Sequence, residues 1–345
     1  MSIADSLPPA DPSARPVLEL LDGFRASKAL FVAVSFGLFD RLHQGAAGLD
    51  ELASERGLAS HALERLLGFL VSRGLLVLNE AGEYSNTESA DRFLRTDSTE
   101  TLAGYILYSE RVLYRMWGRL DDAIREGTNR WEQEFGAKDG IFDHFFSTNE
   151  DKETFLRGMH GLGMLSSPRV AASFDLKPYR RLVDVGGATG HLAIEACRQY
   201  PELDAVVFDL PSVVPVAARQ VAEAGLSERV GTASGDFFSD PLPPADLYAL
   251  GRILHDWGDE KVRLLLAKIA AALPAGGGLL ICEQIVNERK DGPPTALLQS
   301  LNMLIVCEGR ERTSAEYEAL VREAGFSSFE ARRIGPPVDV ILARK

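Results

Sequence analysis

The segment LVDVGGATGHLAIE, residues 182–195, decides the fold class of this chain of 345 residues. It opens with an apolar run, LVDV, that is typical of a buried strand, and it closes with a run that favours a helix. Between the two stand Gly186, Gly187 and Gly190, which let the backbone turn tightly and approach a ligand closely. A strand that passes through such a turn into a helix predicts an open α/β sheet with a ligand site at the turn.

Strand-like and helical runs continue to alternate from residue 176 to the end of the chain. The strand-like runs are RLVDVGG, DAVVFDL, RVGTASGD, ADLYALGRIL and GGGLLICEQIV, and the runs between them are helical. Strands separated by helices of this length form right-handed βαβ units and therefore a parallel sheet. The ending FSSFEARRIGPPVDVILARK (326–345) supplies two closely spaced strands, which suits an antiparallel hairpin at the sheet edge.

The N-terminal half has a different, mainly helical pattern. Residues 1–16 are predicted to form a disordered tail, and residues 17–45 one or two helices. The segment 49–88 then runs helix, turn at Gly57, helix and short hairpin, which is a winged-helix pattern. We therefore expect a winged-helix-like domain over 17–105, a helical connection over 106–175, and the α/β domain over 176–345.

Composition and charge argue for a protein partner of the winged helix. The net charge is −13 and the pI about 5.0, whereas binding of a phosphate backbone needs clustered Lys and Arg. Residues 1–100 hold nine basic and fifteen acidic side chains, and the second helix of the winged pattern offers only Arg65 and Arg73. We expect this domain to contact a protein partner, as a scaffold or dimer module, and the protein to bind no nucleic acid.

The same numbers bear on the compartment. No apolar run reaches the roughly 18–20 residues that cross a bilayer, so we expect no membrane association. The N-terminal segment has an acid and prolines where a signal peptide needs basic and then apolar residues. Cys197, Cys282 and Cys307 form no C-x-x-C pair and predict reduced, buried thiols in a cytoplasmic protein.

Three acids at strand ends indicate which ligand the sheet binds. Asp184 stands two residues before Gly186, in the D-x-G-x-x-x-G form of S-adenosylmethionine enzymes rather than the G-x-G-x-x-G form of dinucleotide enzymes. Asp209 ends the next strand, where a carboxylate can accept from both ribose hydroxyls. Asp236 and Phe237, in GDFF, follow the third strand and are expected beside the amino group and the face of an adenine. Together these features favour S-adenosylmethionine over NAD.

The segment GRILHDWGDE (251–260) has two interpretations. In the first, Asp256 is the N-cap of the helix that follows, with Asp259 three residues on, and His255 is an incidental neighbour. In the second, His255 ends a strand at the ligand-binding edge and is a catalytic base. The cofactor motifs upstream favour the second interpretation, and the cap interpretation of Asp256 is compatible with it.

The ordered segments LVDVGGATG, VFDLPSVV, GDFFSDPLPPADLY, LHDWGDEK, PAGGGLLICEQIV and SLNMLIVCEGRERTSAEYEALVREAGF carry a resemblance over nearly the whole chain. They resemble the metal-independent small-molecule O-methyltransferases of the plant caffeate and flavonoid type, most of all the acetylserotonin (hydroxyindole) group. The resemblance implies a Rossmann-like class I methyltransferase domain with a seven-stranded sheet, no metal, and an N-terminal domain that builds a homodimer.

The resemblance also implies roles for named residues. A sulfonium methyl is already activated, so the protein must supply positioning and a group that removes a phenolic proton. A histidine that titrates near neutrality suits this, and His255 is the expected base. Glu283 and Glu311 match positions that flank the base and orient its ring. Arg252 is expected on the cofactor side, and Asp256 is expected to contact substrate.

The substrate pocket is inferred from the same likeness, and the helical connection 106–175 is expected to line it. Asn302 and Met303 match substrate-pocket positions, and Met159 and Phe146 are expected to line the same pocket. Val306 stands where the acetylserotonin enzymes carry a polar glutamine, which favours a more apolar aromatic substrate. The acceptor is therefore predicted only as a hydroxylated aromatic of the phenolic, hydroxyindole or polyketide type.

Two alternatives remain open from the sequence. One is a winged-helix regulator that senses S-adenosylmethionine, which the acidic N-terminal region disfavours. The other is an enzyme of this fold that uses the cofactor for different chemistry, such as hydroxylation or decarboxylation of a polyketide. Detection of a single added methyl in the product separates this second alternative from methyl transfer.

Overall fold

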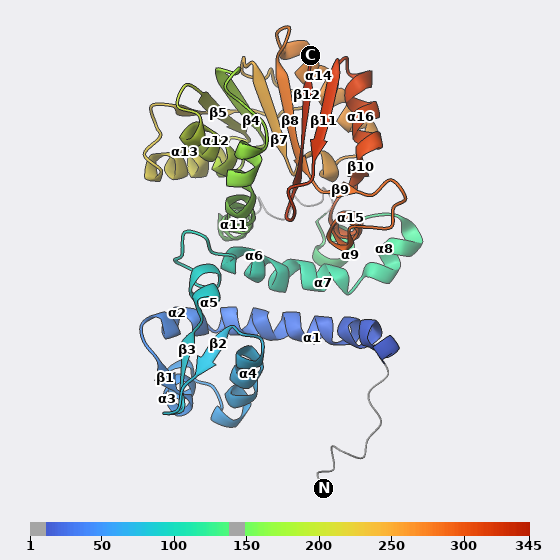
Figure 1. The fold of residues 1–345 in the computed structure, drawn as a ribbon. Coiled ribbons are helices and arrows are strands. Elements are labelled where there is room, and N and C mark those ends of the chain that lie inside the picture. Colours follow the sequence, from blue (N-terminus) through green and yellow to red (C-terminus); the bar gives the residue numbers. More distant parts are fainter. Residues whose placement is uncertain (1–11, 138–148) are drawn as a thin grey trace. The chain divides into compact units, whose positions relative to one another are not determined.

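The computed structural model describes residues 12–137 and 149–345, and the chain divides into two compact units, Met1–Glu110 and Arg111–Lys345 (Figure 1). Residues 12–16, predicted above as part of a disordered tail, are helical instead. A short 3-10 turn, Pro12–Ala14, leads into helix α1, which begins at Arg15. Pro16 lies in the first turn of this helix, where its fixed backbone angle suits helix initiation.

The first unit contains the predicted winged-helix arrangement. Its elements are α1 (Arg15–Ser35), α2 (Leu38–His43), β1 (Ala47–Gly48), α3 (Leu49–Arg56), α4 (Ser60–Ser72), β2 (Leu76–Leu78), β3 (Glu83–Asn86), α5 (Glu88–Phe93) and α6 (Ala103–Tyr108). Gly57 ends α3 in the left-handed conformation, with φ of 64°, and turns the chain into α4. Strands β2 and β3 pair antiparallel as the wing, and β1 joins β3 on its other side.

Helix α1 leaves a row of apolar side chains in contact with solvent. Five of them are more than half exposed: Val17, Leu18, Leu20, Leu21 and Phe24. Farther along the same helix Ala33 and Val34 are buried in the core of the first unit. A patch of this kind on an isolated chain marks an interaction surface.

The second unit opens with short helices and one long helix. They are α7 (Tyr114–Trp117), α8 (Leu120–Glu126), α9 (Trp131–Phe135) and α11 (Asn149–Ser173), and a π-helical turn, Ser109–Leu113, precedes α7. Trp131 is fully buried. This segment is helical as predicted, apart from residues 138–148, which lie outside the described part of the chain.

A seven-stranded sheet forms the centre of the second unit, in the order β11-β12-β8-β7-β4-β5-β6. The strands are β4 (Arg181–Val185), β5 (Asp204–Asp209), β6 (Val230–Ser234), β7 (Leu247–Gly251), β8 (Gly278–Glu283), β11 (Ser328–Arg332) and β12 (Asp339–Arg344). The run from β8 to β6 is parallel, and β12 pairs antiparallel with both β8 and β11. The predicted parallel sheet with an antiparallel edge hairpin is confirmed.

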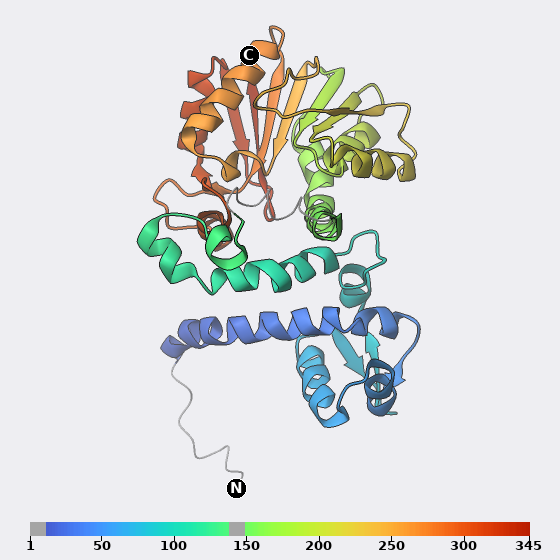
Figure 2. The ribbon, with the colours of Figure 1, turned by 180° about the vertical axis from the view of Figure 1, so that it is seen from behind.

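Helices cover both faces of the sheet, as Figures 1 and 2 show. Alternate strand residues point to opposite faces, so Leu182 joins one core cluster and Val183 the other. The first cluster packs against α11, α12 (His191–Gln199) and α13 (Val214–Glu223), and the second against α14 (Asp259–Ala272) and α16 (Ser314–Glu323). This two-faced burial is why the central strands read as continuous apolar runs.

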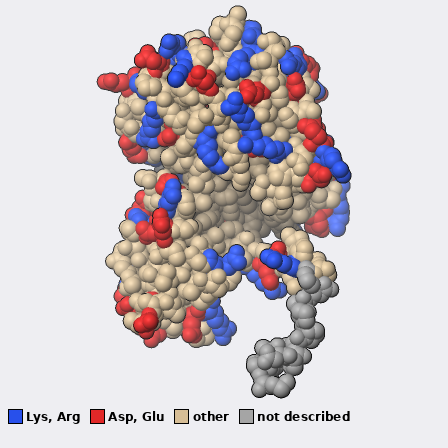
Figure 3. Space-filling model, viewed as in Figure 1, with Lys and Arg blue, Asp and Glu red and all other residues tan. Residues whose placement is uncertain are grey.

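Three further elements lie beside the carboxyl ends of the strands. They are helix α15 (Pro294–Val306) and the short strands β9 (Ile285–Val286) and β10 (Arg312–Thr313), which pair in parallel. Over the face shown in Figure 3, basic and acidic side chains of the second unit are intermingled. Among the described residues, every helix is too short or too polar to pass through a lipid bilayer.

Candidate active site

The glycine-rich turn after β4 is shaped by close contacts that only glycine permits. Gly186 has φ of 68°, and a Cβ there would overlap the side chain of Ile253, with Phe237 close behind at 3.7 Å. A Cβ on Gly187 would lie 2.8 Å from the carboxylate of Asp184. The turn therefore packs against the segments that follow β6 and β7, at the carboxyl edge of the sheet.

Asp184 and Asp209 lie beside this turn, on the two adjoining strands β4 and β5. Asp209 Oδ2 accepts from the backbone N–H of Ala188 at 2.8 Å, which ties the end of β5 to the loop. Asp184 is 2% exposed, and its Oδ2 has no hydrogen-bond partner among the described residues. Burial, together with the negative charge of Asp209, raises the pKa of Asp184 to about 7. Burial also raises the pKa of Asp209. The hydrogen bonds that Asp209 accepts from two backbone N–H groups lower its pKa, but burial outweighs them.

Asp236 and Phe237 follow β6, as predicted, in a turn with its own hydrogen bonds. Asp236 Oδ1 accepts from the N–H of Phe238 at 2.8 Å, and Oδ2 accepts from the Ser239 hydroxyl. Lys268 Nζ donates to the carbonyls of Phe237 and Phe238 from helix α14. The turn is thus fixed locally, with the Phe237 ring beside the glycine-rich loop.

His255 lies in a 3-10 turn, Leu254–Asp256, and not at the end of the strand as the sequence predicts. Strand β7 ends at Gly251, and Arg252 then takes a left-handed conformation with φ of 59°, which turns the chain out of the sheet. The prediction that Asp256 caps the next helix is also wrong. Helix α14 begins at Asp259, its N-cap is Gly258, and no side chain caps it. The extra turn moves Asp256 away from the helix end.

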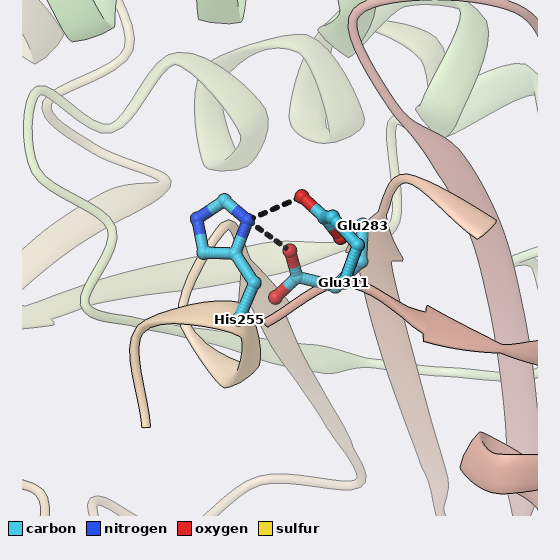
Figure 4. Close-up of side chains that lie close together, drawn as sticks. All are labelled: His255, Glu283 and Glu311. Carbon is cyan, nitrogen blue, oxygen red and sulfur yellow. Dashed lines mark hydrogen bonds and ion pairs between the residues drawn. The ribbon is translucent and has the colours of Figure 1, made fainter. Parts of the chain in front are cut away.

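Two glutamates face one nitrogen of the His255 ring (Figure 4). Nδ1 lies 2.7 Å from Glu311 Oε1 and 3.2 Å from Glu283 Oε2. Figure 4 shows the other ring nitrogen, Nε2, pointing away from both glutamates. Among the described residues, the carboxylate oxygen nearest to Nε2 is Asp256 Oδ1, at 3.6 Å. In the neutral ring, this arrangement keeps the proton on Nδ1 and leaves Nε2 as the acceptor.

The two glutamates hold different parts of the structure. Glu283 also accepts, through Oε1, from the N–H groups of Ile253 and Leu254 at 2.9 and 2.8 Å. It therefore fixes the start of the histidine turn as well as facing the ring. Glu311 makes the shorter contact to the imidazole and comes from the segment just before β10.

The sequence predicts a histidine that titrates near neutrality, but the pKa of His255 in the structure is higher. Burial lowers the pKa of His255, but the negative charges of the three surrounding carboxyls outweigh it and raise the pKa to about 9. Burial raises the pKa of Glu283, and the positive imidazole opposes that change. In the absence of ligands His255 is therefore an imidazolium at neutral pH, stabilised by its carboxylates.

The residues predicted for the substrate pocket are divided between α15 and α11. Asn302, Met303 and Val306 are all buried on α15. The Asn302 Oδ1 accepts from the indole N–H of Trp117 at 2.9 Å. Met159 lies half-buried on α11, and Phe146 falls outside the described residues.

Several residues at the site were missed from the sequence. Trp131 donates its indole N–H to the carbonyl of Val306 at 2.7 Å, and Cys307 donates its thiol to Asp256 Oδ1 at 3.1 Å. Arg312 is fully buried beside the histidine turn. No local pattern identifies such residues, because their partners lie far away in the sequence. The one available signal was the position of Cys307 and Arg312 within a motif that already contained Glu311.

The site contains the one group of potential metal ligands found among the described residues, His255, Glu283 and Glu311. Their facing atoms are already engaged with each other through Nδ1. Cys197, Cys282 and Cys307 are all buried and free. Burial raises the pKa of the Cys307 thiol well above its usual value, and the negative charge of Asp256 adds to this, so it remains a protonated donor.

Comparison with known proteins shows two family models that match the chain. Residues 117–327 match the O-methyltransferase domain model, and residues 18–96 match the O-methyltransferase dimerisation domain model. Bovine acetylserotonin O-methyltransferase is 40% identical over 333 residues, covering 95% of this chain and 96% of the relative. A human probable bifunctional dTTP/UTP pyrophosphatase/methyltransferase is also 40% identical over 332 residues, but the chain spans only 53% of that protein's length.

A solved structure agrees with the sequence relatives. Human N-acetylserotonin methyltransferase in complex with S-adenosylmethionine has a TM-score of 0.92 and 35% identity, covering 98% of this chain and 99% of that one. The predicted cofactor is thus the one bound by a close structural neighbour. Taken with the glycine-rich turn, the strand-end acids and the two domain matches, these findings show that the chain belongs to the S-adenosylmethionine-dependent O-methyltransferase family.

Proposed function

We propose that this protein methylates a hydroxyl group of a small aromatic molecule, with His255 as the general base. The observation that carries the proposal is the orientation of the ring, because both glutamates face Nδ1 and leave Nε2 as the proton acceptor. S-adenosylmethionine supplies, when bound, a methyl group activated on a sulfonium. The protein must then place the hydroxyl and remove its proton.

The cofactor residues fit the charges of this ligand. Asp184 Oδ2 and Arg252 Nε are buried and lack hydrogen-bond partners among the described residues, one an acceptor and the other a donor. The amino-acid portion of S-adenosylmethionine carries an ammonium and a carboxylate, which match them. We assign Asp209 to the ribose hydroxyls and Asp236 and Phe237 to the adenine. Gly186, Gly187 and Gly190 give the ligand access to the backbone of the loop.

In the proposed reaction Nε2 of His255 takes the proton of the substrate hydroxyl while Glu311 and Glu283 stabilise the imidazolium that forms. A cation bound near the ring lowers its pKa, so a loaded site has a larger fraction of neutral imidazole than the free protein. Asp256 Oδ1 is 3.6 Å from Nε2, and we assign this carboxylate to the substrate side of the ring. Cys307 would hold that carboxylate in position.

We propose an acceptor that is aromatic and mainly apolar around its hydroxyl. Met303 and Val306 supply apolar walls, and Asn302 supplies an amide whose oxygen already accepts from Trp117. Acetylserotonin, named in the relatives, belongs in the test panel with simple phenols, catechols and polyketide aromatics. Met159 and Phe146 are assigned to the pocket only by the sequence resemblance. A cytoplasmic location is likewise a proposal from the sequence.

We further propose that the first unit forms a homodimer. The dimerisation-domain match covers most of α1, whose five exposed apolar side chains are otherwise unexplained. A second copy of the chain would cover them.

The test of the base is His255→Ala. Turnover of the best acceptor in the panel, with product mass showing one added methyl, should fall by about 10²–10⁴-fold. Binding of S-adenosylhomocysteine, measured by calorimetry, should persist. His61→Ala, at an exposed histidine of α4, is the matched control and should keep full activity. Near-wild-type turnover in His255→Ala would refute the assignment.

A further inference from the structure

We propose that Arg312 is a positioning residue that holds the turn carrying His255 in the geometry needed for proton transfer. The inference rests on the proposed role of His255 as the base. It adds a residue that acts on the backbone of the turn rather than on the imidazole or the ligands.

The guanidinium of Arg312 reaches carbonyl groups on both sides of the turn. Its Nη1 donates to the carbonyl of Leu254 at 2.8 Å, and its Nη2 donates to the carbonyl of Trp257 at 2.9 Å. These two carbonyls flank His255 and Asp256. One planar, rigid group therefore fixes the spacing between the residues before and after the pair, which a single point charge could not do.

The turn needs such support because its own hydrogen bonds are long. Asp256 N donates to Ile253 O at 3.2 Å and Trp257 N donates to Leu254 O at 3.4 Å, whereas ordinary N–H···O bonds are near 2.9–3.0 Å. No side chain caps the turn. A 3-10 segment of three residues has little stability by itself, so contacts from elsewhere must define its conformation.

Arg312 complements the other contacts to the turn. Glu283 accepts from the two N–H groups at its start, while Arg312 donates to the carbonyl of Leu254, its first residue, and to that of Trp257, which follows it. Gly309 packs against the same backbone, because a Cβ there would overlap the His255 carbonyl and lie 2.6 Å from the N–H of Trp257. The turn is therefore held by a carboxylate, a guanidinium and a glycine contact.

The position of Arg312 in the chain couples the turn to the ring. It directly follows Glu311, whose carboxylate contacts His255 Nδ1. Arg312 and Thr313 form β10, which pairs in parallel with β9. Strand β9 begins two residues after Glu283. A shift of this strand pair would move the ring contact and the backbone contact together.

A buried guanidinium requires a partner, and Asp259 supplies one. Its Oδ1 lies 2.7 Å from Nη2 and 3.1 Å from Nε of Arg312. Burial raises the pKa of Asp259, but the hydrogen bond and charge of Arg312 outweigh this and lower it. Because Asp259 begins α14, the guanidinium is anchored to a helix start as well as to the turn.

The decisive variant is Arg312→Lys, which keeps the charge but cannot bridge both carbonyls. We expect kcat to fall about 10–100-fold, as for a misplaced catalytic group, with S-adenosylhomocysteine affinity unchanged. A second readout is the titration of His255, followed by NMR of the ring carbon and assigned with His255→Gln. Its pKa should fall below that of the wild type, since the ring is no longer held against both glutamates.

Arg310→Lys is the matched control, because Arg310 also pairs with Asp259 but its side chain is 40% exposed, whereas that of Arg312 is fully buried. It should leave kcat and the His255 titration unchanged. Asp259→Ala removes the anchor of the guanidinium but keeps the arginine, and it should give a smaller change in the same direction. If Arg312→Lys does not fold, Asp259→Ala still tests the proposal.

The outcomes separate the two proposals. Active His255→Ala would overturn the proposed base and this inference with it. Inactive His255→Ala together with wild-type kcat and His255 titration in Arg312→Lys would overturn the inference alone. A lowered melting temperature with an unchanged His255 titration would likewise overturn it, because Arg312 would then be purely structural.

Discussion

Replacement of Gly163 by alanine should destabilise the second unit, through a clash between α11 and the start of α12. A Cβ at Gly163 would overlap three atoms of the His191 ring, and the farthest of them, Cε1, would be 2.5 Å away. The ring cannot move freely, because its Nδ1 is 2.8 Å from the Ser167 hydroxyl. Burial lowers the pKa of His191 to about 3, so the ring is neutral.

The magnitude follows from three contributions. Overpacking in a tight interface costs about 1–3 kcal/mol, and loss of the hydrogen bond to Ser167 about 1 kcal/mol. The replacement of a helical glycine by alanine returns about 0.5–1 kcal/mol. The net loss is about 2 kcal/mol, which corresponds to a decrease of about 4–8 °C in the melting temperature of a unit of this size.

The assay is urea unfolding followed by tryptophan fluorescence. Trp117, Trp131 and Trp257 all lie in the second unit, so this signal reports on the unit that contains Gly163. Gly68→Ala in α4 is the control, because a Cβ there meets nothing within 4 Å. Circular dichroism should show that this variant is stabilised by about 0.5–1 kcal/mol.

The clash also predicts an energetic interaction between Gly163 and His191. In a His191→Ala background the ring is absent, so Gly163→Ala should be neutral or stabilising. An equal cost in both backgrounds would refute the clash, as would wild-type stability of Gly163→Ala alone. A double-mutant cycle isolates this pairwise effect.

Three further outcomes are expected. Leu20→Asp places a charge on the exposed face of α1, where Leu20 is 81% exposed, and should shift the protein from dimer to monomer in light scattering. S-adenosylhomocysteine binding, measured by calorimetry, should weaken as the pH falls below about 7, because protonation removes the Asp184 charge. The Asp184→Asn variant should bind this ligand weakly at every pH. The kcat/KM for the acceptor should rise with pH towards about 9, where His255 of the free protein loses its proton, and a profile that falls over pH 7–9 would contradict the base assignment.

The sequence by itself determined the fold class and the edge of the sheet that carries the site. Both depend on local patterns: the alternation of apolar strands with helices, the glycine-rich turn after β4, and acids at Asp184, Asp209 and Asp236. Parallel strands bring all their carboxyl ends to one edge, so these residues could be grouped without coordinates. The helix–turn–helix and wing of the first unit were also predictable, because they too depend on local sequence patterns.

Only the tertiary structure decided how the proposed catalytic groups meet. His255, Glu283 and Glu311 come from separate segments, and the contacts to Nδ1 depend on the pairing of β7 with β8 and of β9 with β10. The turn at Arg252, the raised pKa of His255 and the contacts of Arg312 also arise from residues distant in sequence. Side-chain periodicity contains no information about such separations, because they are set by packing of whole elements. The resemblance could name Glu283 and Glu311, but their distances to the ring required the fold.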